Sequence, residues 1–267
     1  MEINKIIQGN NVEVIKSFPE NFIDLTLTSP PYDNQRVYNG YSFDFDNLAP
    51  ELFRITKHGG VLVWIVADQT INGSETGTSF KQALKFIATG FLLHDTMIYA
   101  KKNPMPMTHR RYEQAFEYMF VFSKGKPKTF NPLKEPCKIA GKSKSRFRDA
   151  PYDNHAIRHN SECTYKVKDE KQRTNIWEYS IGSKEEDKDL KKLHPASFPN
   201  QLAIDMILSW TNEQDIVMDC FAGSGTSGVE SYKLNRKFVL IEISQKYCEI
   251  AQNRFKRLNI DVPIICH

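Results

Sequence analysis

Short apolar runs alternate with helix-like patterns along two stretches of the chain. In residues 1–123 the runs are typical of strands, and apolar residues recur at helical spacing between them. Regular patterning resumes at Pro195. Strand, helix, strand repetition predicts a mostly parallel sheet with helices on both faces. The expected strands are 23–27, 61–66, 92–99, 116–122, 216–218 and 238–241, and the expected helices are 48–56, 79–88, 198–211, 225–234 and 244–257.

The segment between these two stretches follows neither period. From Lys124 to about Lys192 it is polar and poor in aliphatic residues, which indicates an irregular insertion. It carries 18 basic and 11 acidic residues, although the net charge of the chain is only +4. Charge alone fits a nucleic-acid binder and a solvated surface equally well. We therefore expect residues 1–123 and 194–267 to form one core that carries an insertion at residues 124–193.

Composition and the N-terminus argue against a membrane or secreted protein. The longest strongly apolar run, Val61 to Ala67, is far too short to cross a bilayer. The first residues, MEINKIIQGNN, lack the apolar region of a signal peptide. The five cysteines are scattered and odd in number, which indicates reduced thiols. We expect a cytoplasmic protein without membrane partners.

A glycine-rich turn, Asp219-Cys220-Phe221-Ala222-Gly223-Ser224-Gly225-Thr226, follows the strand at 216–218 and opens a helix. Glycines there let the backbone approach a ligand, and the helix N-terminus favours negative charge. Glu242 closes the next strand, where a carboxylate can accept hydrogen bonds from ribose hydroxyls. A glycine turn alone often only packs a helix on a sheet, but the acid at this distance favours an adenosine-containing cofactor.

A proline-stiffened turn, Thr28-Ser29-Pro30-Pro31-Tyr32, follows the strand at 23–27. Ligands of open α/β sheets bind at such strand ends. The prolines keep the backbone extended and leave its carbonyls as rigid acceptors, and Tyr32 offers a face on which a base can stack. Taken alone, such a motif is more often only a stiff loop.

A third motif, His194-Pro195-Ala196-Ser197-Phe198-Pro199, precedes the helix that is expected to reach Thr211. Ser197 suits the N-cap of that helix and Pro199 its first turn. The start of such a helix can bind a carboxylate. Taken alone, an ordinary capped helix is the commoner explanation.

In this order the three motifs resemble those of the β-class DNA amino-methyltransferases. That family has S-P-P-Y or D-P-P-Y first, then a target-recognition region, then H-P-A-x-F-P, D-x-F-x-G-S-G-T and an acidic strand end. The resemblance covers Ile6 to about Ser123 and His194 to Arg257. It implies a Rossmann-like methyltransferase fold with a seven-stranded, mostly parallel sheet and a circularly permuted motif order. Residues 124–193 would be the target-recognition insertion.

The resemblance implies S-adenosylmethionine as cofactor and double-stranded DNA as substrate. A flipped base would receive the methyl group by direct in-line transfer, which requires the proline turn and the glycine turn to meet at neighbouring strand ends. Catalysis would fall to Ser29, Pro30, Pro31 and Tyr32. The expected cofactor contacts are Asn10, Ser197, Phe198, Pro199, Asp219, Phe221, Ala222, Gly223, Ser224, Gly225, Thr226 and Glu242.

Two features bear on the details of this assignment. The family usually has Gly-Asp before its first loop, whereas this chain has Gly9-Asn10, whose amide can meet an adenine edge without a charge. Ser before P-P-Y is associated in the family mainly with cytosine N4, and Asp with adenine N6. We therefore expect methylation of cytosine N4, with adenine N6 as the alternative. Other classes of function are a catalytically silent DNA-binding protein on this scaffold and a methyltransferase that acts on RNA or protein.

The polar segment contains a basic run that ends before Asp149. Beside a methyltransferase core, phosphate contact is the better interpretation of this run. His155, His159 and Cys163 share a helical spacing but have no evident fourth ligand, so we expect no metal site. The resemblance allows a homodimer and a cognate restriction endonuclease as further partners. The expected DNA contacts are Lys138, Lys142, Lys144, Arg146 and Arg148.

Overall fold

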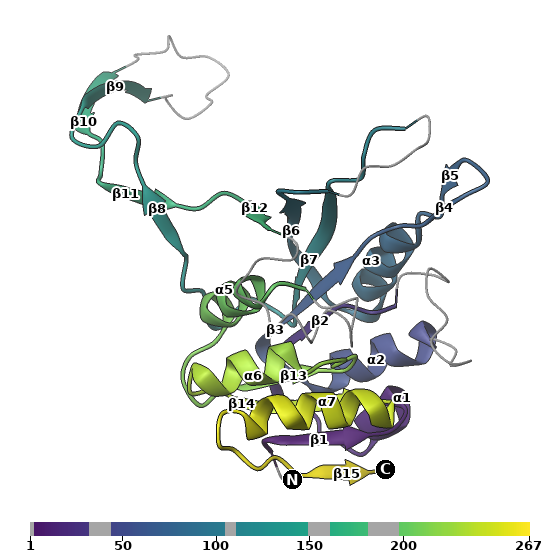
Figure 1. Ribbon diagram of the computed structural model, residues 1–267. Coiled ribbons are helices and arrows are strands. Elements are labelled where there is room, and N and C mark those ends of the chain that lie inside the picture. The colour runs from purple at the N-terminus through teal and green to yellow at the C-terminus, as the bar shows by residue number, and fades with distance from the viewer. Residues whose placement is uncertain (1–2, 32–43, 105–110, 149–160, 181–197) are drawn as a thin grey trace. The chain divides into compact units, whose positions relative to one another are not determined.

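The computed structural model divides the chain into two compact units, which are described separately (Figure 1). The first unit joins residues 1–131 with 175–267, and the second comprises residues 132–174. The second unit is shorter than the expected insertion, because residues 124–131 and 175–179 pack with the first unit. The residues described are 3–31, 44–104, 111–148, 161–180 and 198–267.

A mostly parallel sheet is the centre of the first unit. Within the described residues it has nine strands, two more than expected, and β7 is the one strand that runs antiparallel to its neighbours. In spatial order the strands are β12 (Ile176–Tyr179), β6 (Leu92–Lys101), β7 (Phe116–Ser123), β3 (Thr56–Val66), β2 (Ile23–Thr28), β13 (Ile216–Asp219), β14 (Lys237–Glu242), β1 (Lys5–Gln8) and β15 (Ile264–Cys266).

The expected covering of both faces by helices is confirmed. Side chains of β14 alternate between the faces: Val239 and Ile241 join a core cluster with α1, α2 and α3, whereas Phe238 and Leu240 join one with α6 and α7. Helix α5 contacts β2 and α6. No helix in the described ranges is long and apolar enough to cross a membrane. The helices are α1 (Asn11–Lys16), α2 (Phe45–Ile55), α3 (Thr78–Thr89), α5 (Asn200–Trp210), α6 (Thr226–Lys233) and α7 (Gln245–Lys256).

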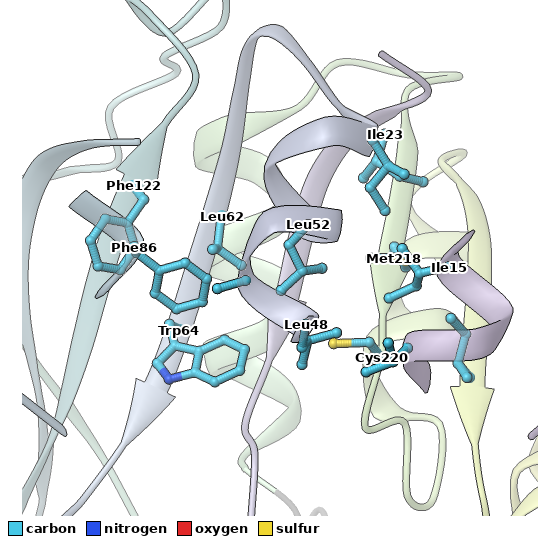
Figure 2. Close-up of a cluster of buried hydrophobic side chains, with 14 of the residues drawn as sticks. Ile15, Ile23, Leu48, Leu52, Leu62, Trp64, Phe86, Phe122, Met218 and Cys220 are labelled. Atoms are coloured by element: carbon cyan, nitrogen blue, oxygen red, sulfur yellow. The ribbon is translucent and has the colours of Figure 1, made fainter. Parts of the chain in front are cut away.

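An aromatic cluster fills the core between β3, β7, α2 and α3 (Figure 2). Phe86 of α3 is fully buried, and its ring centroid lies 5.0 Å from those of both Trp64 and Phe122. The Trp64 indole donates a buried hydrogen bond to Gln82 Oε1 at 2.8 Å, so its polar group is satisfied. Phe45 at the start of α2 packs edge-on against Phe86. These contacts fix the helices that cover β2 and β3.

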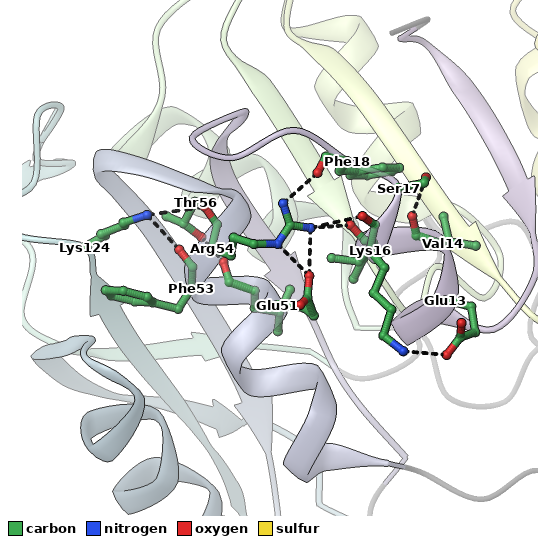
Figure 3. A network of polar contacts seen from close by, with 12 residues as sticks. Glu13, Val14, Lys16, Ser17, Phe18, Glu51, Phe53, Arg54, Thr56 and Lys124 are labelled. Carbon is green, nitrogen blue, oxygen red and sulfur yellow. Dashed lines mark hydrogen bonds and ion pairs between the residues drawn. The ribbon is translucent and has the colours of Figure 1, made fainter.

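Two cations satisfy carbonyl groups at helix ends on this side of the sheet (Figure 3). Arg54, at the end of α2, donates to the carbonyls of Ile15 and Phe18, at and just after the end of α1. Lys124 Nζ donates to the carbonyls of Phe53 and Arg54. Burial lowers the pKa of Lys124. The two carbonyls replace the water molecules that would otherwise accept hydrogen bonds from the ammonium group. These contacts hold α1 and α2 together.

The described residues of the second unit form two antiparallel ribbons rather than an irregular segment. Strands β8 (Lys134–Pro136) and β11 (Glu170–Gln172) form one ribbon, and β9 (Ser143–Arg148) and β10 (Ser161–Lys166) form the other. The expectation of an irregular insertion is therefore wrong for this part. Such ribbons are mostly polar, and hence lack the apolar alternation by which strands are recognised in a sequence.

Each junction between the first and second units is marked by an asparagine that belongs to the first unit. The Asn131 side-chain amide donates to the carbonyls of Leu208 and Thr211, and its backbone N–H donates to Ser209 O. The Asn175 side-chain amide donates to Thr96 O, and its carbonyl accepts from Ile98 N–H. Both junctions are thus fixed to elements of the large sheet and α5.

Several short elements were not expected from the sequence. These are β1, α1, β12 and β15 of the first unit and the hairpin of β4 (Thr70–Ile71) and β5 (Ser74–Glu75). None exceeds six residues, which is too short to show a period. β1 and β15 form one edge of the sheet, and β12 forms the other. Together with the six strands that the sequence pattern located, β1, β12 and β15 make up the nine strands of the sheet.

We predict that Phe86→Ala lowers the free energy of unfolding of the first unit by about 3–5 kcal/mol, because it leaves a cavity in the aromatic cluster. Phe80→Ala on the same helix is the matched control, since Phe80 is half-exposed. Its loss should be less than half as large. Urea unfolding followed by tryptophan fluorescence measures both, and equal losses would contradict the assignment of Phe86 to the core.

Candidate active site at the strand ends

The proline turn and the glycine turn lie at neighbouring strand ends, as the resemblance required. β2 and β13 are parallel neighbours, with Leu25 opposite Val217 and Thr26 opposite Met218. β2 leads through α2 to β3 on one side, while β13 leads through α6 to β14 on the other. The winding of the chain therefore reverses between β2 and β13, which is where open α/β sheets bind ligands.

A side-chain hydrogen bond joins the ends of these two strands. Thr28 Oγ1, in the first residue of the proline turn, donates to Asp219 Oδ1 at 2.6 Å. Both residues are buried. Cys220 Sγ lies 3.9 Å from the same threonine oxygen. Burial raises the pKa of the Cys220 thiol, so this cysteine stays protonated at neutral pH.

The Asp219 carboxylate accepts hydrogen bonds from three directions. Besides Thr28, Phe221 N–H donates to Oδ1 at 3.0 Å and the Ser227 hydroxyl donates to Oδ2 at 2.6 Å. Burial raises the pKa of Asp219, and the three donors oppose that shift. Asp219 is thus buried, and it binds residues of the glycine turn and of the start of α6.

Glu242 at the end of β14 contacts the backbone of the glycine turn. Its Oε2 accepts from Gly223 N–H at 2.8 Å and its Oε1 from Ser244 N–H at 2.9 Å. Burial raises the pKa of Glu242, while the backbone donors lower it. The side chain remains half-buried. A carboxylate oxygen can accept more than one hydrogen bond, so Glu242 can accept a further donor.

The glycine turn needs glycine at two positions. Gly223 and Gly225 have φ values of 50° and 76°, in the left-handed region that side chains rarely adopt. A Cβ on Gly225 would also lie 2.8 Å from the Ala251 Cβ of α7. Ala222 N–H donates to Ile241 O, which ties the turn to β14. The backbone therefore passes close to α7 without steric conflict.

Arg254 of α7 holds the turn from inside, and sequence reasoning missed it. It is 9% exposed, and its Nη1 donates to Ser224 O and Thr226 Oγ1, each at 2.9 Å. The hydroxyls of the expected cofactor residues Ser224 and Thr226 are therefore engaged within the protein. Arg254 lies at the apolar spacing of Ala251 and Phe255, and an arginine on such a face could have indicated a buried role.

The proline turn is described as far as Pro31. Pro30 is buried, and Ser29 and Pro31 are half-buried. Tyr32 lies outside the described residues, so its stacking role stays a prediction. Thr28 is opposite Trp64 in β3, which fixes the start of the turn on its other side.

The loop after β1 reaches the same edge of the sheet. Gln8 is opposite Glu242, and Asn10 Oδ1 accepts from Val12 N–H and Glu13 N–H as the N-cap of α1. The Asn10 oxygen is thus engaged, and its exposed amide group is the part suited to a ligand. Asn11 Nδ2 donates to Cys220 O at 3.2 Å, which ties this loop to the glycine turn.

Helix α5 begins later than expected. Pro199 has extended backbone angles and is the N-cap, so the helix starts at Asn200 and Ser197 is not its cap. The proline carbonyl accepts from Leu202 N–H, as an N-cap carbonyl does. Pro199 is buried and Phe198 half-buried. Ser197 lies outside the described residues, and its contact with a cofactor stays a prediction.

A further buried acid, Asp68, follows β3 at the same edge of the sheet. It accepts from Ser79 N–H at 2.9 Å and from the Ser79 and Thr76 hydroxyls, so it caps the start of α3. Sequence reasoning passed over it. An acid two residues after a buried strand was the signal that could have found it.

The basic residues that were expected to contact DNA lie on and near β9. Lys138, Lys142 and Lys144 are exposed. Lys144, Arg146 and Arg148 occupy alternate positions of β9 and are opposite Tyr165, Cys163 and Ser161 of β10. In a strand, alternate positions share one face. The described residues form no cluster of metal ligands, and His155 and His159 lie outside them.

Comparison with known proteins identifies the family. The family model described as DNA methylase matches residues 23–253. The chain belongs to this family of N4 and N6 amino-methyltransferases. This DNA methylase is 50% identical over 237 residues to the orphan methyltransferase M.BamHII of Bacillus amyloliquefaciens, covering 88% of this chain and 89% of that protein. It is 27% identical over 283 residues to the type II methyltransferase M.HinfI of Haemophilus influenzae, covering 96% and 69%.

Solved structures share the fold of this DNA methylase. PvuII DNA methyltransferase, named as cytosine-N4-specific, aligns with a TM-score of 0.69 at 22% identity, covering 96% of this chain and 87% of that one. M1.HpyAVI in complex with S-adenosylmethionine aligns with a TM-score of 0.61 at 24% identity, covering 94% and 98%. The expected Rossmann-like methyltransferase fold is confirmed.

We predict that Gly225→Ala lowers the free energy of unfolding by about 2–4 kcal/mol, through backbone strain and the contact with Ala251. Gly73→Ala is the matched control, because Gly73 has a φ of 80° but no atom within 4 Å of an added Cβ. It should cost about 1 kcal/mol from strain alone. Chemical denaturation compares the two, and equal costs would remove the steric argument.

Proposed function

We propose that the chain transfers a methyl group from S-adenosylmethionine to N4 of cytosine in double-stranded DNA. The Thr28–Asp219 hydrogen bond carries the proposal, because it sets the turn that would hold the amine beside the turn that would hold the methyl donor. Cytosine is favoured because Ser29, and not an aspartate, precedes Pro30-Pro31-Tyr32. A fold shared with an enzyme named as cytosine-N4-specific supports the same choice.

The strand ends fit S-adenosylmethionine by the chemistry of their groups. Glu242 has lone pairs for ribose hydroxyls, and the Asn10 amide can donate to the adenine edge. At the start of α5, the backbone N–H groups of Phe198 and Asn200, on either side of Pro199, can donate to the methionine carboxylate. Asp219, Ser224 and Thr226 act from inside, by fixing the backbone that the cofactor contacts. The bound cofactor supplies a methyl group on a positively charged sulfur.

Ser29 and Pro30 activate the amine in this proposal. The Ser29 hydroxyl oxygen and the Pro30 carbonyl accept hydrogen bonds from the N4 amino group. Those bonds turn the nitrogen lone pair out of conjugation with the ring and toward the methyl carbon. When the bound cofactor supplies its methyl group, the N–C bond would form as the S–C bond breaks, and the proton released from N4 would pass to solvent water. Positioning and preorganised acceptors supply the rate enhancement, and the protein needs no covalent intermediate.

Nucleoside mass spectrometry tests the target base. Double-stranded DNA of mixed sequence, incubated with the protein and S-adenosylmethionine, should yield N4-methylcytosine. Ser29→Ala is expected to reduce the yield, and reactions with RNA or without cofactor are the controls. N6-methyladenine instead would overturn the cytosine assignment, and methylation of RNA alone would overturn the choice of DNA.

The second unit is the part that we assign to DNA. B-DNA admits a two-stranded β-ribbon into its major groove, and basic side chains there contact phosphates. Three basic positions share one face of the β9–β10 ribbon, namely Lys144, Arg146 and Arg148. By contrast, Lys134 and Lys171 of the other ribbon are already engaged in ion pairs with Glu170 and Glu135.

Neutralising Lys142, Lys144, Arg146 and Arg148 should flatten the salt dependence of DNA binding. Each lost phosphate contact reduces the slope of log K against log salt by about 0.9, so the fourfold variant should lose about 3.6. Lys134→Gln with Lys171→Gln is the matched control in the same unit and should keep the slope. Fluorescence anisotropy across salt concentrations measures it, and an unchanged slope in the fourfold variant would exclude this surface.

A further inference from the structure

Thr28 links two parts of the site at a point where backbone pairing has stopped. The β2–β13 ladder pairs Leu25 with Val217 and Thr26 with Met218. Beyond it, β2 stays paired with β3 as far as Thr28, while β13 stays paired with β14 as far as Asp219. The Thr28–Asp219 hydrogen bond therefore spans the two strands where their chains diverge toward the proline and glycine turns.

The donors to Asp219 differ in what they connect. Phe221 N–H and the Ser227 hydroxyl belong to the same segment as Asp219, so they hold the glycine turn in its own shape. Thr28 is 191 residues away in the sequence and directly precedes Ser29. Loss of its hydroxyl would leave the glycine turn with its internal hydrogen bonds. It would, however, remove this hydrogen bond between the proline turn and the glycine turn.

We propose that Thr28 is a positioning residue for methyl transfer. Its hydroxyl, through Asp219, sets the spacing between the turn that carries Ser29 and the turn that approaches the cofactor. Direct transfer requires the amine nitrogen, the methyl carbon and the sulfur to lie in line, and a misplacement of about 1 Å can cost about 100-fold in rate. The inference rests on the proposed function, because it needs a methyl acceptor at Ser29.

The neighbouring Thr26 provides a matched control. It lies on the same face of β2, two residues earlier, and is equally buried. Within the part of the chain that the structure describes, its hydroxyl has no hydrogen-bond partner. Thr26→Val and Thr28→Val therefore make the same chemical change on one strand, but only the second removes the link to Asp219.

The experiment separates cofactor binding from transfer. We would measure the S-adenosylmethionine Kd by calorimetry and the single-turnover rate of DNA methylation per cofactor-binding site, which corrects for unfolded protein. Thr28→Val should slow transfer by about 10- to 100-fold while the Kd stays within about threefold of wild type. Thr28→Ser, which keeps the hydroxyl, should restore the rate, and Thr26→Val should match wild type.

Two results would overturn the inference: an unchanged transfer rate in Thr28→Val, or a loss of cofactor affinity as large as the loss of rate. The second would mean that Thr28 only supports the glycine turn. If Thr28→Val does not fold, Thr28→Ala removes the same hydroxyl with a smaller side chain and is judged by the same rate and affinity criteria. If the wild-type protein methylates no DNA, the proposed function is wrong. If the wild-type protein is active and Thr28→Val is equally active, only the inference about Thr28 is wrong.

Discussion

The site depends on a buried carboxylate between two parallel strands. Burial of the Asp219 carboxylate costs desolvation energy and raises its pKa. This cost is offset because its oxygens accept hydrogen bonds from the Thr28 hydroxyl of β2 and from Phe221 N–H and the Ser227 hydroxyl, which follow β13. The Asp219 carboxylate thus binds donors within the glycine turn and α6, and it also binds Thr28, the first residue of the proline turn. Two segments far apart in the sequence thereby become one site.

Backbone groups of the glycine turn also form hydrogen bonds with side chains from outside the turn. These side chains are those of Arg254, Glu242 and Asn11. Their charges and amides point at carbonyls and N–H groups that have no partner in a regular helix or strand. The turn is therefore rigid before any ligand arrives, which lowers the entropic cost of binding.

Long apolar elements and ordered motifs could be predicted from the sequence. β2, β3, β6, β7 and helices α2, α3 and α7 are long enough to show their period, and motif order implied that the two turns meet. Short or polar elements could not, such as α1 and the ribbons of the second unit. The partners of individual side chains could not be predicted either, because the contacts of Arg254 and Thr28 are made only by tertiary packing. Asn10, which was expected to contact the cofactor, is also the N-cap of α1.

The two asparagines at the junctions anchor the chain where it leaves and re-enters the first unit. The hydrogen bonds of the Asn131 amide go to α5 and the residues just after it, and those of the Asn175 amide go to β6, so these contacts are made within the first unit. A replacement loop of another length or composition meets the same anchored ends. Under the proposed assignment of the second unit to DNA, this unit could be exchanged while the contacts at the strand ends stay as they are.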